Sequence, residues 1–219
     1  NGYFSVQDIS SMQVAHWAAP QEGDSIIDVC AAPGGKSIHL AEMLHGTGYV
    51  QARDLTEYKV GLIQENIFRS GLTNIEAVQW DATVLHEESK EKADIVIADL
   101  PCSGLGVLGK KTDLKYKMTE QTQQDLVALQ KSILSNVKSY VKPGGILLYS
   151  TCTIHKAENM DNVHWFLKEH SDFELVSIKE RLCEELQASV VEEGCLQLLP
   201  GIHKSDGFFI AKFKKVNHG

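Results

Sequence analysis

The sequence predicts one α/β domain built on a doubly wound, largely parallel sheet. Apolar runs of strand length alternate along the chain with segments that have the apolar spacing of helices. Two of these runs, residues 93–99 and 145–150, are apolar on both faces, as expected of strands that helices cover on both sides. At 219 residues, 43% of them hydrophobic, the chain can bury one core and is short for two.

The elements follow in order from this alternation. Helices are predicted at residues 7–19, 35–44, 57–70, 120–141 and 157–169. Strands are predicted at residues 25–30, 49–52, 75–79, 93–99, 145–150, 173–178 and 207–213. The third helix should end at Gly71, because a residue without a side chain readily adopts the left-handed cap conformation. The connection over residues 100–118 is long for a compact domain, which indicates a function.

Each of the two most apolar strands is followed by a loop that carries a cysteine. The first loop reads Pro-Cys-Ser around Cys102, and the second reads Thr-Cys-Thr around Cys152. Ligands of open α/β sheets bind outside the carboxyl ends of the strands, so both thiols should reach one site. With Asp99 beside the first thiol, the pair indicates nucleophilic chemistry on an electron-poor substrate.

The composition limits which cellular location and which binding partners we expect for the protein. The five cysteines include no Cys-x-x-Cys pair, and no apolar stretch has the length of a membrane span or a signal peptide. These features predict a reducing, cytoplasmic location and no membrane partner. The scattered histidines lack metal-ligand spacing, so no metal is expected. Because the chain starts at Asn1 rather than at a methionine, we expect a domain to be missing upstream.

The net charge of −8 argues against a surface that clamps nucleic acid throughout, because phosphate contacts require lysine and arginine. A local basic cluster nevertheless follows the first cysteine, and it consists of Lys110, Lys111, Lys115 and Lys117. Such a cluster is either a solvated face or a set of phosphate contacts, and the sequence favours neither.

A glycine-containing loop follows the first predicted strand, at residues 28–37. It lacks the Gly-x-Gly-x-x-Gly spacing of dinucleotide sites. It matches the end of a phosphate loop at Lys36, but Cys30 occupies the first glycine position and Pro33 has no backbone N–H to offer a phosphate. A third interpretation is a loop that approaches a less charged nucleoside cofactor. Asp54, 19 residues beyond Gly35 (54 minus 35), would then hold ribose hydroxyls.

Three stretches together resemble the RNA (cytosine-5) methyltransferases, specifically the bacterial Sun or Fmu type that acts on ribosomal RNA. They are Asp-Val-Cys-Ala-Ala-Pro-Gly-Gly-Lys at 28–36, Asp-Leu-Pro-Cys-Ser-Gly-Leu-Gly at 99–106 and Tyr-Ser-Thr-Cys-Thr-Ile at 149–154. Residues 4–8 resemble the entry to the catalytic domain of that family, and residues 199–203 and 206–211 resemble its closing segment. The chain departs from the family where two arginines are usual, at Lys110 and Lys111, and where proline is usual, at Thr112.

The resemblance implies a Rossmann-like sheet of the S-adenosylmethionine-dependent methyltransferase type, mostly parallel with an antiparallel C-terminal strand. It implies that residues 1–219 are the catalytic domain of a longer chain with an N-terminal RNA-binding domain. The implied reaction is methyl transfer from S-adenosylmethionine to C5 of a cytosine in RNA, with 16S ribosomal RNA as the expected partner. We further expect a monomer.

The resemblance also implies roles for individual residues. Cys152 would add to C6 of the cytosine, Asp99 would bind the N3 edge of the ring, and Cys102 would assist release of the product. The methionine end of the cofactor would be lined by Cys30, Ala31, Ala32, Pro33, Gly34, Gly35 and Lys36. Asp54 would bind the ribose and Asp81 the adenine, with Asp99 also close to the cofactor.

Two other functions stay open at this point. A phosphate-loop nucleotidase would use Asp99 to position Mg²⁺ at the end of its strand. An RNA-binding scaffold without catalysis would keep the fold and the cofactor. It would need neither thiol, so the presence of both Cys102 and Cys152 argues against it.

Overall fold

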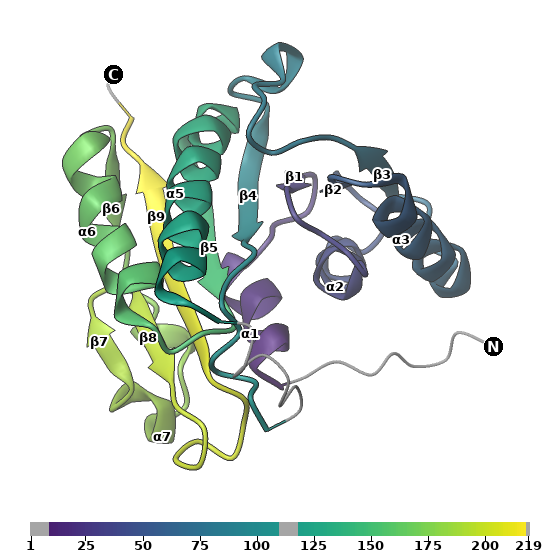
Figure 1. The fold of residues 1–219 in the computed structure, drawn as a ribbon. Helices are drawn as coiled ribbons and strands as arrows, with labels where there is room; N and C mark the ends of the chain where they lie inside the picture. The colour runs from purple at the N-terminus through teal and green to yellow at the C-terminus, as the bar shows by residue number, and fades with distance from the viewer. Residues whose placement is uncertain (1–8, 110–117, 218–219) are drawn as a thin grey trace.

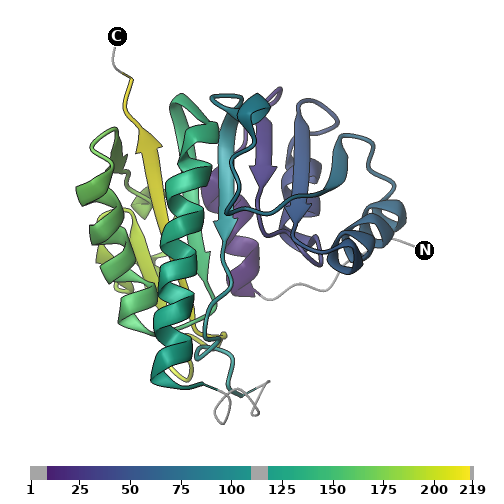
Figure 2. The ribbon, with the colours of Figure 1, turned by 45° about the horizontal axis from the view of Figure 1, so that its top comes forward.

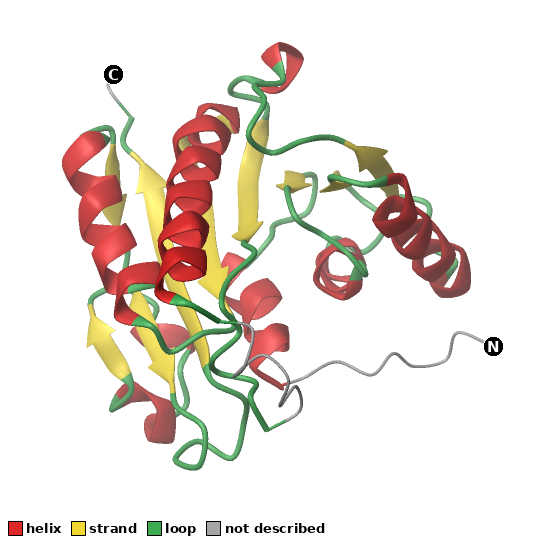
Figure 3. Ribbon diagram, viewed as in Figure 1, coloured by secondary structure: helices red, strands yellow, loops and turns green. Residues whose placement is uncertain are grey.

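A nine-stranded sheet with helices on both faces makes up residues 9–109 and 118–217, which are the residues that the computed structural model describes (Figures 1 and 3). The strands are β1 (Ser25–Asp28), β2 (Tyr49–Asp54), β3 (Ile75–Gln79), β4 (Ala93–Asp99), β5 (Val141–Thr151), β6 (Phe173–Leu175), β7 (Val190–Glu192), β8 (Cys195–Leu198) and β9 (Phe208–Lys215). The α-helices are α1 (Ile9–Ala18), α2 (Gly35–Met43), α3 (Glu57–Ser70), α5 (Glu120–Val137), α6 (Met160–Glu169) and α7 (Glu184–Gln187). The predicted alternation of strands and helices is confirmed.

The strand order is β3-β2-β1-β4-β5-β9-β8-β7, and the first five strands are parallel. β9 is antiparallel to β5, and Figure 2 shows it pointing against β4 and β5. β8 pairs with the first half of β9 and β6 with its end, both antiparallel. The expectation of a mostly parallel sheet with an antiparallel C-terminal strand is therefore confirmed, and β6, β7 and β8 extend the antiparallel part.

Two hydrophobic clusters, one on each face, hold the helices against the sheet. Ile95 and Ile97 of β4 belong to the cluster that contains apolar residues of α1 and α2, whereas Val96 and Ala98 belong to the cluster with α5 and α6. Successive side chains of a strand point to opposite faces, so this division shows that β4 is covered on both sides. Helices on both faces leave the ends of the strands as the place where loops can build a site (Figure 2).

Local sequence determines where helix α3 begins and ends. Thr56 at its N-cap accepts a hydrogen bond from the backbone N–H of Lys59, as a threonine cap does. Gly71 caps the other end with φ of 71°, in the predicted left-handed conformation. Within the described residues, no helix combines the length and the apolar character needed to cross a membrane.

The hairpin of β7 and β8 was not predicted. Its strands have three and four residues, and Glu193 and Gly194 form a two-residue connection between them. Gly194 has φ of 77°, so this turn needs a residue without a side chain. The sequence signal for this hairpin was Gly194 between two short apolar runs. The acidic pair Glu192 and Glu193 interrupts the apolar pattern of the first strand, so the strand was not recognised.

Other differences concern boundaries. β5 begins at Val141, earlier than residue 145, and α5 ends at Val137 rather than at residue 141. Lys138–Tyr140 form a 3-10 turn that leads directly into β5. The predicted strand at 173–178 is shorter and ends at Leu175, although the Val176 N–H still donates to the Lys212 carbonyl of β9 at 3.0 Å.

Candidate active site

Four carboxylates and two cysteines lie at the carboxyl edge of the parallel strands. Asp28, Asp54 and Asp99 are the last residues of β1, β2 and β4, and Asp81 follows β3 by two residues. The register pairs Asp99 with Ser150 near the end of β5. The parallel sheet therefore brings together side chains that are far apart in sequence.

The glycine loop turns tightly between β1 and α2. The Ala31 N–H donates to the Arg53 carbonyl at 2.8 Å, and the Gly34 N–H donates to the Ala31 carbonyl at 2.7 Å. Gly34 has φ of 105°, and a Cβ there would lie 3.3 Å from Cγ2 of Ile63. Glycine thus fits this position for both conformation and space. The first turn of α2, with its free N–H groups, consequently begins at the edge that carries the carboxylates.

Lys36 of α2 forms an ion pair with Asp99. Its Nζ lies 2.7 Å from Oδ2 of Asp99, while the Ser150 hydroxyl donates to Oδ1 at 2.7 Å. Burial by itself lowers the pKa of Lys36, but the charge and hydrogen bond of Asp99, with the charges of Asp28 and Cys152, together outweigh it. The pKa is therefore raised, and Lys36 stays protonated. The contact of Lys36 with a cofactor, which the resemblance implies, stays a prediction; the structure shows that Lys36 compensates the charge of Asp99.

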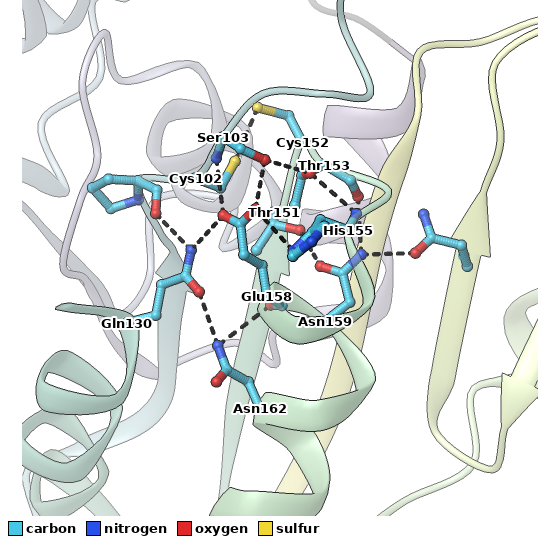
Figure 4. A network of polar contacts seen from close by, with 12 residues as sticks. Cys102, Ser103, Gln130, Thr151, Cys152, Thr153, His155, Glu158, Asn159 and Asn162 are labelled. Atoms are coloured by element: carbon cyan, nitrogen blue, oxygen red, sulfur yellow. Dashed lines mark hydrogen bonds and ion pairs between the residues drawn. The ribbon is translucent and has the colours of Figure 1, made fainter. Parts of the chain in front are cut away.

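The two cysteine sulfurs lie 3.3 Å apart, as expected from neighbouring strand ends (Figure 4). A hydrogen bond to Cys152 is the largest cause that raises the pKa of Cys102, followed by burial. Cys102 therefore stays a thiol, and its S–H is placed to donate to the Cys152 sulfur.

Backbone contacts hold the two cysteine loops together. The Gly106 N–H donates to the Cys152 carbonyl at 3.0 Å, and the Gly207 N–H donates to the Gly106 carbonyl at 2.8 Å. A Cβ on Gly106 would lie 2.3 Å from the Gly207 carbonyl oxygen, so only glycine allows this approach. The spacing of the sulfurs is consequently a property of the packed loops.

Asp28 belongs to the site, although the sequence prediction did not include it. It is 1% exposed, its Oδ2 accepts from the Ser37 hydroxyl at 2.6 Å, and its buried Oδ1 has no hydrogen-bond partner within the described residues. Burial raises the pKa of Asp28 to about 7; the Ser37 hydrogen bond opposes this rise and the charge of Asp99 adds to it. Its place at the end of β1, directly before the glycine loop, was the signal that could have found it.

The raised pKa of Asp28 predicts a pH-dependent stability. Between its ordinary value of 3.8 and about 7, the folded protein binds the proton and the unfolded chain does not. The free energy of unfolding should therefore fall as pH rises through this range, by on the order of 1 kcal/mol per pH unit. Asp28→Asn keeps an acceptor for Ser37 and removes the titration. Urea unfolding at pH 5 and pH 7.5 should show a smaller loss for the variant, and equal losses would contradict the assignment.

Asp54 is almost fully buried and tied to the glycine loop. Its Oδ2 accepts from the Ala32 N–H at 3.0 Å, and its Oδ1 accepts from the Leu55 N–H at 2.8 Å and lies 3.0 Å from Nζ of Lys59. A carboxylate offers about four lone-pair sites, so capacity for one further donor is left. Binding of ribose by Asp54 stays a prediction.

Asp81 is partly buried in the turn after β3. Its Oδ1 accepts hydrogen bonds from the backbone N–H of Thr83 at 2.8 Å and from the Thr83 hydroxyl at 2.7 Å. These bonds order the turn, and the Trp80 N–H just before it donates to the Asp54 carbonyl at 3.0 Å, which keeps the turn at the edge of the sheet that carries Asp54. The contact of Asp81 with adenine also stays a prediction.

A buried polar network lies behind the cysteine loops, and sequence reasoning missed it (Figure 4). Its centre is Glu158, a side chain with 0% exposure that accepts hydrogen bonds from Ser103 and Gln130. Asn159 binds both residues that flank Cys152: its Oδ1 accepts from the Thr151 hydroxyl at 2.7 Å, and its Nδ2 donates to the Thr153 carbonyl at 3.0 Å. The sequence signal that could have revealed this network was an acid followed by an amide, Glu158 and Asn159, just after the second cysteine motif.

The remaining predicted features lie elsewhere. The lysine cluster of Lys110, Lys111, Lys115 and Lys117 falls outside the described residues. Cys195 is buried in β8, in keeping with a core role, whereas Cys183 is exposed and is not a core residue. Among residues 9–109 and 118–217, no three potential ligands are grouped as a metal site would require.

Comparison with known proteins identifies a family with this arrangement. The family model described as 16S rRNA methyltransferase RsmB/F matches residues 15–214. The probable ribosomal RNA small subunit methyltransferase B of Bacillus subtilis is 43% identical over 217 residues, which cover 98% of this chain and 48% of that protein. Ribosomal RNA small subunit methyltransferase F of Cronobacter sakazakii is 32% identical over 99% of this chain and 45% of its own length.

A solved structure agrees with the sequence relatives. The crystal structure of NSun6 from Pyrococcus horikoshii with SFG has a TM-score of 0.85 and 32% identity, and the match covers 99% of this chain and 54% of that one. The chain thus spans about half the length of the curated relatives it matches. Because the family model covers nearly all of the sequence, the chain belongs to the RsmB/F family of 16S rRNA methyltransferases.

Proposed function

We propose that this chain is the catalytic domain of an enzyme that methylates C5 of a cytosine in 16S ribosomal RNA. The observation that carries the proposal is the pair of sulfurs 3.3 Å apart, in the loops that follow Asp99 and its register partner Ser150. The names of the family and of its relatives supply the RNA. The other half of those relatives has no counterpart here, so we propose that an additional RNA-binding domain completes the enzyme. A ribosomal RNA substrate supports a cytoplasmic location for the enzyme.

The glycine loop and the carboxylates around it fit S-adenosylmethionine. The N-terminus of α2 can receive the carboxylate of the methionine part, and the unpartnered Oδ1 of Asp28 is a buried acceptor close to it in sequence. The relative from Pyrococcus horikoshii was solved with SFG, an analogue of this cofactor. S-adenosylmethionine bound there would supply an electrophilic methyl group.

Cys152 provides the nucleophile for the first step. C5 of cytosine is a poor nucleophile, so the Cys152 sulfur adds to C6, and the electron pair of the C5–C6 double bond moves toward N3 and O2 of the ring. C5 of the adduct then carries the electron density that attacks the methyl group. The Cys102 S–H stabilises the Cys152 thiolate before the attack by donating to it.

Asp99 and Lys36 act on the edge of the base. A carboxylate only accepts hydrogen bonds, so Asp99 binds the 4-amino group, or N3 once a proton reaches it. Lys36 holds Asp99 in place at 2.7 Å and adds positive charge where the ring becomes electron-rich. The base must be single-stranded or flipped out of its helix to reach these groups.

Cys102 becomes a base only after the first step. Its pKa is raised chiefly by Cys152, and this cause disappears when the Cys152 sulfur is bound to carbon. Cys102 can then lose its proton to solvent and accept the proton from C5. The electrons of the C5–H bond restore the C5–C6 double bond, the bond from C6 to sulfur breaks, and Cys152 regains its thiolate.

The two alternatives explain the geometry less well. In a phosphate-loop enzyme the serine after the lysine binds Mg²⁺, but Ser37 has 0% exposure and donates to Asp28. Lys36 likewise pairs with Asp99 rather than facing an empty phosphate site. A scaffold without catalysis gives no reason for two half-buried thiols at hydrogen-bond distance.

Asp54→Asn is expected to weaken S-adenosylmethionine binding by about tenfold, because a hydrogen bond to a charged group contributes about 1.5–3 kcal/mol. Asparagine keeps the size of the side chain and can still accept one backbone bond, so the loop should remain folded. Calorimetric titration gives the affinity. Asp24→Asn, just before β1 at the other end of the strand, is the control and should bind normally. Normal affinity of Asp54→Asn would rule out the ribose contact.

The proposed activity is tested by incubating the full-length protein with S-adenosylmethionine and purified 16S, 23S and transfer RNA. We expect 5-methylcytosine at a defined position of 16S RNA only, as read by bisulfite sequencing. Modification at another atom of the base, or in another RNA alone, would contradict the proposal.

A further inference from the structure

Glu158 connects the first cysteine loop to helix α5, although its own side chain has no assigned role in the chemistry. It lies at the end of a 3-10 turn, Lys156–Glu158, and faces Ser103 of the first cysteine loop and Gln130 of α5 (Figure 4). Glu158 and Gln130 both have 0% exposure. Their hydrogen bonds run to Pro101 and Ser103, so they hold Cys102 through the residues on either side of it.

The network holds both peptide groups that flank Cys102. On one side, the Gln130 amide donates to the Pro101 carbonyl at 2.9 Å. On the other side, the Ser103 N–H donates to Oε2 of Glu158 at 2.9 Å, and the same oxygen accepts from Gln130 at 3.0 Å. Fixing the two peptide planes fixes φ and ψ of Cys102 and therefore the direction of its side chain.

The second cysteine loop is held mainly by a different residue. Asn159 binds on both sides of Cys152, through Thr151 and Thr153. The two systems are linked by the Ser103 and Thr153 hydroxyls, 2.8 Å apart, and by Nδ1 of His155, which lies 3.8 Å from Oε1 of Glu158. Glu158 thus acts mostly on the Cys102 loop and Asn159 mostly on the Cys152 loop.

We propose that Glu158, together with Gln130, is a positioning residue that aims Cys102 at the reacting base and so controls the release step. The inference rests on the proposed function, because it needs the adduct on Cys152. Loss of the network should leave the attack by Cys152 largely intact and slow the removal of the C5 proton. A displacement of about 1 Å at a catalytic group can cost about 10²-fold in rate.

Three variants separate positioning from simple stability. Glu158→Ala removes the acceptor of the Ser103 N–H, and Gln130→Met removes the donor to the Pro101 carbonyl at a similar side-chain length. Glu158→Gln is the conservative variant. Its amide oxygen can accept from Ser103 and Gln130 while its NH₂ donates to the Ser103 hydroxyl, so the peptide planes stay held. Phe173→Leu, in the hydrophobic cluster with α5 and α6 but paired with the end of β9, is a control for lowered stability alone.

The measured quantity is the fraction of protein linked to RNA after turnover, seen on denaturing gels. Glu158→Ala and Gln130→Met should accumulate about tenfold more adduct than wild type, with cofactor affinity unchanged, if release slows as much as misplacement of a base allows. Glu158→Gln and Phe173→Leu should resemble wild type. Adding Cys102→Ala to Glu158→Ala should give no more adduct than Cys102→Ala alone, because both changes act on one step.

Two kinds of result would overturn the inference. If folded Glu158→Ala or Gln130→Met shows a wild-type adduct level, or loses activity without adduct, the network has no role in release. If Glu158→Ala does not fold, Gln130→Met decides alone. Failure of the proposed function looks different, since Cys102→Ala itself would then form no adduct, and the inference would be overturned with it.

Discussion

Cys152→Ala is expected to lose methyl transfer by about 10⁴-fold or more, as enzymes do when their nucleophile is removed. Binding of S-adenosylmethionine should be normal, since the glycine loop is unchanged. No covalent complex with RNA should form.

The measurement is transfer of labelled methyl groups to 16S RNA by the purified full-length enzyme. Cys183→Ala makes the same substitution at an exposed cysteine outside the site and should be fully active. If Cys152→Ala kept more than about one hundredth of the activity, covalent catalysis by this residue would be wrong.

Cys102→Ala is expected to transfer one methyl group and then stop. The variant still has its nucleophile, but it lacks the base for the C5 proton, and loss of such a base costs about 10²–10⁴-fold. Turnover should therefore fall by this amount while the first transfer continues. Removing the S–H donor also makes the Cys152 thiolate less stable, so the first transfer should be slower than in wild type.

Rapid-quench kinetics separates the two steps of the Cys102→Ala reaction. A burst close to one methyl group per active site, followed by a very slow phase, is the expected course. Equal slowing of the burst and of the later phase would show that Cys102 serves the attack rather than the release.

The backbone of the site could be predicted because it depends on local sequence and on sheet rules. Apolar runs that end at Asp99 and Ser150 predicted two strands, and neighbouring parallel strands place their loops at one edge. That is why Cys102 and Cys152 were expected to meet, and they lie 3.3 Å apart. The end of helix α3 at Gly71 could likewise be predicted, because glycine readily adopts the left-handed cap conformation.

The side-chain partners could not be predicted because they join residues that no local pattern connects. Lys36 and Asp99 form a pair across 63 positions (99 minus 36), and Ser103 and Glu158 across 55. The pKa of Asp28 is raised by burial, and this burial arises only when the sheet and the helices are packed together. The lysines at 110–117 lie outside the described residues, so their contact with RNA stays a prediction.

The division of labour between the thiols is tested most directly by locating the nucleotide in the complex trapped with Cys102→Ala. After nuclease and protease digestion, mass spectrometry should find a methylated cytidine attached to the peptide that contains Cys152. A parallel reaction with Cys152→Ala should yield no attached nucleotide. A cytidine attached to Cys102 in the Cys152→Ala protein, with none on Cys152 in the Cys102→Ala protein, would contradict the account and assign the nucleophile to the Pro-Cys-Ser loop.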